Sequence, residues 1–138
     1  MIAGRASGGI VSAMRTAAQS IGAGAEELVA RRLRASGWTI LGRNVRVGRA
    51  EIDILAVDPL ASAGRSELVA VEVRWRRRRD FGLPEETVSH AKLARLRAAA
   101  LSLRDPAIGS ATVSRLSVRV DVVAVEPGGR VRHHRAVG

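Results

Sequence analysis

The segment 68–75 is apolar at every position except Glu72 and Arg74. A strand on the surface of a sheet alternates apolar and polar residues, whereas a strand that is apolar on both faces must be covered on both sides. The segment is therefore predicted to be a central strand with other layers packed on both of its faces. Glu72 and Arg74 are two positions apart, so they project from the same face.

Hydrophobic periodicity and turn residues place the other elements around this strand. The predicted elements are helices at 22–36 and 85–104 and strands at 38–47, 50–57 and 117–125. On strand 50–57, strict alternation predicts one face with Ile52, Ile54 and Ala56 and another with Glu51, Asp53, Leu55 and Val57. The order helix, three strands, helix, strand predicts an α/β fold with a mixed sheet, in which the second helix is a crossover.

The 138 residues suffice for one domain, which we expect to span 21–127. Residues 1–20 are predicted to be a flexible tail, and 128–138 either a basic tail or an edge strand. The start of the chain has no continuous apolar run long enough for a signal or membrane segment. We therefore expect a cytoplasmic protein with no membrane partner.

Positive charge dominates the composition, with 23 Lys and Arg residues against 13 Asp and Glu and a formal net charge of +10. Such a balance makes phosphate polyanions the first partner to consider, although a genome that favours arginine codons would give the same excess. The chain has no Cys, which excludes thiolate metal sites. A hard cation held by oxygen ligands is then the natural metal hypothesis.

Three carboxylates are predicted to lie in otherwise apolar surroundings. Glu26 shares the inward face of the first helix, Asp53 lies on the second strand, and Glu72 lies on the central strand. Buried carboxylates are unfavourable unless they are paired or bound to a metal. The pattern indicates a site for Mg²⁺ or Mn²⁺, while ion pairs of Asp53 and Glu72 with Arg43 or Arg74 remain the structural alternative. For Glu26, the helix dipole offers another explanation.

The order of these elements and residues resembles the restriction-endonuclease-like superfamily, whose core is αβββαβ with a mixed central sheet flanked by helices. Within it, residues 22–125 are similar to the bacterial UPF0102, or YraN, family. The matching stretches are Gly22, Ala25 and Glu26 with Leu33, Gly37 and Trp38; Arg43 and Asn44; Glu51, Ile52 and Asp53; 71–74; Phe81, Gly82 and Pro84 with Val88 and Lys92; and 121–124.

This resemblance implies the fold, a nucleic-acid-binding role and a metal-dependent nuclease activity. The site residues it implies are a catalytic set of Glu26, Asp53, Glu72 and Arg74, in which Asp53 and Glu72, with Glu26, hold the metal. Arg74 stands where the superfamily most often has Lys. An Arg is always protonated, so Arg74 is expected to hold the scissile phosphate or stabilise the transition state, and not to act as a base.

The expected nucleic-acid contacts are Arg43, Arg76, Arg77, Arg78, Arg79 and Lys92. An arginine run at the end of a strand is expected to be solvated and to guide a phosphate backbone into the site. Trp75 could stack on a base, but its alternation with Val71 and Val73 favours a packed face.

Three functions remain open from the sequence. The first is a Mg²⁺-dependent endonuclease-like protein that hydrolyses phosphodiester bonds in DNA more than RNA, with branched or damaged DNA as substrate. The superfamily also includes archaeal-type Holliday junction resolvases, and two cuts at a symmetric junction would favour a homodimer. The second is a catalytically inactive nucleic-acid-binding module. The third is a basic scaffold that binds an acidic protein.

Overall fold

The structure is a computed structural model, and it describes residues 17–62, 64–76, 88–105 and 113–137. Residues 1–16 of the predicted tail 1–20 and the arginines Arg77, Arg78 and Arg79 lie outside the described residues, whereas residues 17–20 belong to a helix. The described elements are α2 (Ala17–Ala35), β1 (Thr39–Val47), β2 (Ala50–Ser62), β3 (Arg65–Trp75), α3 (His90–Ser102), β4 (Ser117–Val125) and β5 (Val131–His134). None of these helices is long and apolar enough to cross a membrane.

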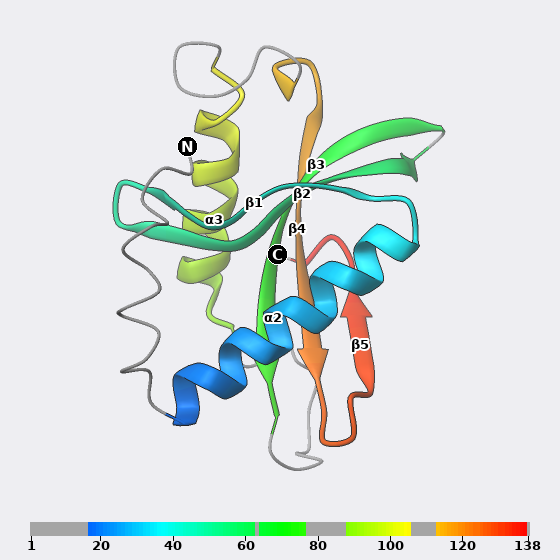
Figure 1. The fold of residues 1–138 in the computed structure, drawn as a ribbon. Helices are drawn as coiled ribbons and strands as arrows, with labels where there is room; N and C mark the ends of the chain where they lie inside the picture. The colour runs from blue at the N-terminus through cyan, green and yellow to red at the C-terminus, as the bar shows by residue number, and fades with distance from the viewer. Residues whose placement is uncertain (1–16, 63, 77–87, 106–112, 138) are drawn as a thin grey trace, which may run out of the picture.

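One five-stranded sheet with the order β1-β2-β3-β4-β5 forms the middle of the molecule (Figure 1). Its strand pairs are antiparallel except β3 and β4, which are parallel and are connected through α3. A parallel pair needs such a crossover connection. The predicted α/β fold, with the αβββαβ core of a restriction-endonuclease-like protein and a mixed sheet, is confirmed.

The two helices cover opposite faces of this sheet. On one face, Leu93 and Leu96 of α3 pack with Leu68 and Ala70 of β3. On the other, the α2 residues Ala25, Val29, Ala30 and Leu33 pack with Val69 and Val71. The segment 68–71 of β3 is 0–1% exposed. The prediction of a central strand covered on both sides is therefore correct.

The ends of several elements differ from the prediction. The helix α2 ends as predicted before Gly37, which has a φ of +91° and donates its N–H to the Arg34 carbonyl at 3.0 Å. However, α2 begins at Ala17 instead of residue 22. The helix α3 begins at His90 instead of residue 85, because Ser89 is its N-cap and accepts the Lys92 N–H at 3.1 Å. Of the alternatives for the C-terminal segment, the structure has the edge strand, β5.

The strand β2 continues past Asp58 and Pro59, where the sequence predicted its end. The pairing with β3 shifts between Asp58 and Ser62, so an irregularity accommodates the proline, which has no N–H for the ladder. Ser62 then pairs with Arg65, and Gly64 with a φ of +74° lies in the tight turn between them. The chain between the predicted strands 50–57 and 68–75 thus extends both strands as a hairpin.

The predicted alternation of β2 is wrong around Asp53. Ile52 packs on the α3 side together with Leu55, whereas Ile54 and Ala56 pack on the α2 side. The neighbouring β1 residue Asn44, which lies between the partners of Ile52 and Ile54, has a φ of +52°. Both strands are therefore irregular at this level, and the Asp53 carboxylate accepts the backbone N–H of Val73 in β3 at 2.9 Å.

Candidate active site

The three predicted carboxylates lie in one electrostatic environment. Burial, the negative charge of Glu72 and that of Glu26 raise the pKa of Asp53 to about 7, although the Val73 N–H opposes the shift. Burial also raises the pKa of Glu26, with Arg43 acting against it and Glu51 and Glu72 adding to it. A charge shifts a pKa appreciably only over a short distance, so Glu26 and Glu72 lie near Asp53. The helix α2 and the strands β2 and β3 therefore bring the three carboxylates into one region, but among the described residues no three such side chains lie close enough to hold one metal ion together.

Glu72 is the most deeply buried member of this group, at 3% exposure. Its Oε2 atom accepts from Lys92 Nζ at 2.7 Å and lies 3.9 Å from Arg74 Nε. Its Oε1 atom is buried and has no hydrogen-bond partner in the part of the chain that the structure describes. A buried acceptor left in this way is unfavourable. It therefore marks a position where a ligand would stabilise the site.

Glu26 and the neighbouring Glu27 confirm the predicted orientation of α2. The Glu26 side chain is 18% exposed and that of Glu27 is 46% exposed. Arg43 bridges the two, with 2.6 Å between its Nη1 and Glu27 Oε1 and 3.8 Å between its Nη2 and Glu26 Oε1. Arg43, expected at a nucleic-acid contact, thus faces the carboxylates of α2 from β1.

The donor set fits a hard cation only in part. Within residues 17–62, 64–76, 88–105 and 113–137, no three His, Cys, Asp or Glu side chains form a group that could hold a metal ion. Asp53 and Glu72 remain as a pair of carboxylates, and Mg²⁺ is commonly held by one or two carboxylates with water completing the octahedron. A hydrogen bond with the Glu72 carboxyl also contributes to the raised pKa of Asp53, so the two carboxyl groups lie against each other, and Glu72 Oε1 has no other donor among the described residues. A cation at this position would compensate the negative charge that the two groups share.

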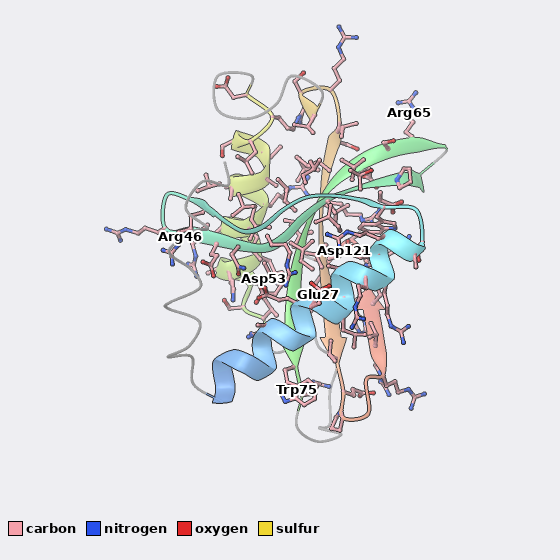
Figure 2. The ribbon with its side chains drawn as sticks, in the orientation of Figure 1. Glu27, Arg46, Asp53, Arg65, Trp75 and Asp121 are labelled. Atoms are coloured by element: carbon pink, nitrogen blue, oxygen red, sulfur yellow. The ribbon has the colours of Figure 1, made fainter. Side chains whose placement is uncertain are left out.

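The basic residues after Glu72 do not behave as one solvated run. Arg74 faces Glu72, with 3.9 Å between Arg74 Nε and Glu72 Oε2, and its side chain is 34% exposed. Arg76 is only 7% exposed, and its N–H is bonded to the Val125 carbonyl at 2.8 Å, so it extends the sheet instead of facing solvent. Trp75, expected in a packed face, is 38% exposed at the end of β3 (Figure 2).

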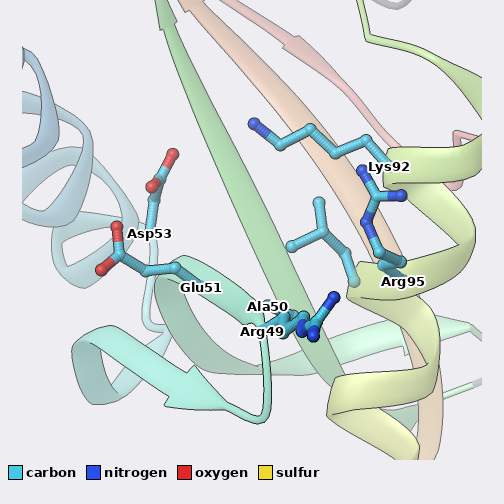
Figure 3. A pocket seen from close by; sticks show the side chains of 7 residues that line it. Arg49, Ala50, Glu51, Asp53, Lys92 and Arg95 are labelled. Carbon is cyan, nitrogen blue, oxygen red and sulfur yellow. The ribbon is translucent and has the colours of Figure 1, made fainter.

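A pocket of about 240 Å³ opens beside Asp53, between the β1–β2 turn and α3 (Figure 3). Figure 3 shows Lys92 and Arg95 extending from α3, across the pocket from the carboxylates of Glu51 and Asp53. The sequence pattern did not single out Arg49 and Arg95, which also line it. For Arg95 a signal existed, because it follows Lys92 by three positions and therefore shares its helix face.

A separate polar cluster lies elsewhere on the sheet. Asp121 of β4 is fully buried and receives two hydrogen bonds from Arg119, at 2.8 and 2.9 Å, and one from His133 at 2.7 Å. Arg119 also contacts Asp58 and Glu67, at 3.0 Å each. Figure 2 shows Asp53 and Asp121 at different places along the sheet. Since its charges are paired with one another, this cluster is structural.

Comparison with known proteins places this site in a family. The model of the uncharacterised protein family UPF0102 matches residues 25–125, which include Glu26, Asp53, Glu72 and Lys92. The chain belongs to the UPF0102 family. It is 43% identical over 114 residues to a UPF0102 protein of Symbiobacterium thermophilum, an alignment that covers 81% of this chain and 88% of the relative.

The alignments with two further relatives cover nearly the full length of those relatives. A UPF0102 protein of an Arthrobacter species is 41% identical over 124 residues, which cover 86% of this chain and 95% of the relative. A UPF0102 protein of Beutenbergia cavernae is 37% identical over 126 residues, which cover 88% and 98%. The family resemblance stated from the sequence motifs is thus confirmed for this UPF0102 chain.

Proposed function

We propose that this chain is a metal-dependent endonuclease-like protein that binds nucleic acid, DNA in preference to RNA, and hydrolyses a phosphodiester bond with Mg²⁺ or Mn²⁺. Branched or damaged DNA is the proposed substrate. The observation that carries the proposal is the buried Glu72, whose Oε1 lacks a partner beside the raised pKa of Asp53. Lys92 pairs with Glu72 and Arg43 lies near Glu26, whereas Asp53 forms no ion pair in the part of the chain that the structure describes, and a cation between Asp53 and Glu72 Oε1 would supply the charge that both lack.

Each residue of the site has a role in this chemistry. Asp53 and Glu72 would hold the ion, with Glu26 acting through water. When bound, Mg²⁺ activates a water molecule and neutralises charge on the phosphate. Lys92 Nζ holds Glu72 Oε2, which leaves Oε1 for the cation. Arg74 is permanently charged and partly exposed, so it holds the scissile phosphate and stabilises the charge that develops on it.

One contact favours a second candidate, a nucleic-acid-binding module without catalysis. Lys92 Nζ lies 2.7 Å from Glu72 Oε2 and supplies part of the positive charge that a metal would supply. The side-chain pair of Glu72 and Lys92 could then be a structural ion pair.

A cleavage panel separates the two candidates. Duplex, four-way junction, flap and single-stranded substrates are incubated with the purified chain and Mg²⁺ or Mn²⁺, with EDTA as the control. The nuclease proposal expects cleavage of at least one substrate that stops in EDTA. Salt-dependent binding without cleavage under every condition would instead assign the chain to the binding module.

Arg74→Lys is expected to keep or raise the cleavage rate, whereas Arg74→Gln should lower it by about tenfold or more. Lysine retains the positive charge, while glutamine removes a charged contact to the phosphate. Single-turnover cleavage rates of the three proteins measure the effect. A rate for Arg74→Gln equal to that of the wild type would show that Arg74 does not contact the reacting phosphate.

A further inference from the structure

The pocket beside Asp53 continues into a second one along α3. The first holds Asp53, Lys92 and Leu96; the second, of about 340 Å³, holds Val47 and Ala98. Arg49, Ala50 and Arg95 line both of them. The two adjoining pockets make up one groove, the α3 groove, that leads from the carboxylates along α3 to Ser102 at the end of this helix. Arg49 and Arg95 lie where its two halves meet.

Positive charge is available at this junction. Among the residues that the structure describes, neither Arg49 nor Arg95 forms an ion pair, and both side chains are exposed. Of the two acids in the lining, Glu51 already pairs with Arg46, with 3.4 Å between Glu51 Oε2 and Arg46 Nε. Two guanidinium groups without a carboxylate partner, facing a hollow, suit a phosphate group.

The two halves of the groove differ in chemistry. The half next to Asp53 carries charged side chains, while the other half is lined mainly by Val47, Ala50, Ala98 and Ala99. A nucleic-acid strand alternates charged phosphates with less polar sugars and bases. The sequence of carboxylates, guanidinium pair and apolar surface therefore matches a reacting phosphate, the next phosphate and the nucleoside beyond it.

We propose that the α3 groove binds one strand of the nucleic acid on one side of the scissile bond, with a phosphate between Arg49 and Arg95. This inference rests on the proposed function, since it takes the carboxylate cluster as the reacting centre. The phosphate is either an internal phosphodiester or the terminal phosphomonoester of a strand end. The two pockets, of about 240 and 340 Å³, are small, so we expect them to hold a single strand and not a duplex.

The test compares two double variants that remove the same charge, each from one residue in the β1–β2 hairpin and one residue on α3. Arg49→Ala with Arg95→Ala removes the proposed phosphate contacts. The control is Arg46→Ala with Arg97→Ala: Arg46 is 81% exposed on β1, Arg97 lies on α3, and neither lines the groove. Binding of single-stranded oligonucleotides is measured in EDTA over a range of salt concentrations, so that cleavage does not enter.

The double variant of Arg49 and Arg95 should bind single-stranded oligonucleotides about tenfold more weakly than the wild type does. The control double variant should bind them less than threefold more weakly. The salt slope should fall by about 0.7 for each phosphate that the first double variant no longer neutralises. Melting temperatures close to that of the wild type are expected for both, since all four residues are exposed and the control loses only a 3.4 Å hydrogen bond from Arg97 to the Val118 carbonyl and the exposed ion pair of Arg46. Equal reductions of affinity in the two double variants would overturn the inference and leave the proposed function standing.

Oligonucleotides with a 5′-phosphate, a 3′-phosphate or no terminal phosphate identify the source of the bound group. Tighter binding from one terminal phosphate that disappears in the Arg49 and Arg95 variant assigns the groove to a strand end. Equal binding of all three, with an equal weakening in that variant, assigns it to an internal phosphate. If the wild-type protein binds none of them, both the proposed function and this inference are wrong.

Discussion

Asp53→Asn and Glu72→Gln are each expected to lower the cleavage rate on the order of 10³-fold while leaving nucleic-acid binding intact or stronger. Loss of a ligand removes several kcal/mol of transition-state stabilisation that the ion supplies. Each change also removes a negative charge from a basic surface, which favours a polyanion. Single-turnover cleavage and binding in EDTA measure the two effects separately.

Glu27→Gln is the matched control for this pair. It removes one carboxylate from the same region, but the Glu27 side chain is 46% exposed and faces Arg43. Its cleavage rate should stay within a few-fold of the wild type. If both Asp53→Asn and Glu72→Gln cleaved at the wild-type rate, these carboxylates would be excluded from the reaction, and the activity would point to a contaminating nuclease.

The pH dependence of stability gives a second measurement on Asp53. Its pKa in the folded chain is about 7, above the ordinary value of 3.8, so the folded state binds this proton more tightly than the unfolded state. The ionised carboxylate therefore destabilises the fold increasingly as the pH rises from about 3.8 to about 7. The melting temperature of Asp53→Asn should be above that of the wild type at pH 8 and should approach it at pH 4. Addition of Mg²⁺ should raise the melting temperature of the wild type but not that of the variant.

The sequence predicted the fold well because its strongest signals are periodic. Residues 68–71 are apolar on both faces, and only a central strand buries both. Glu26 shares a helix face with Val29 and Leu33, so its inward direction followed from the 100° rotation per residue. The order of α2, β2 and β3 then places Glu26, Asp53 and Glu72 in one region of the molecule.

Other parts of the site depend on contacts that no local pattern records. Asp53 reaches the Val73 N–H because β2 departs from strict alternation, while the sequence pattern assumes a regular strand. The turn residue Arg49 and the α3 residue Arg95 meet only through the packing of α3 on the sheet. Arg76 resembles its neighbours in sequence, but its backbone bond to Val125 buries it.

The sequence did not predict the cluster around Asp121, because its members come from β2, β3, β4, β5 and the C-terminal segment. Burial alone would raise the pKa of Asp121, but hydrogen bonds from His133, Arg119 and the Ala136 N–H lower it below the ordinary value of 3.8. A group with a lowered pKa stabilises the fold above the unfolded pKa, and this stabilisation is lost as the pH falls through the folded pKa. The cluster should therefore hold the sheet together above a pH of about 3.8.

Asp121→Ala is expected to lower the free energy of unfolding by about 3 kcal/mol, at the lower end of the range for breaking a buried ion pair. Arg119 keeps its ion pairs with Asp58 and Glu67, which limits the loss of stability. Its guanidinium nevertheless loses the two hydrogen bonds to the Asp121 carboxylate. For comparison, Glu27→Ala breaks an exposed pair and should change stability by less than about 1 kcal/mol. Urea unfolding at pH 7 and pH 3 measures both variants, and the gap between Asp121→Ala and the wild type should narrow at the lower pH. Equal unfolding midpoints for the two variants at pH 7 would mean that the strands are held by apolar packing alone.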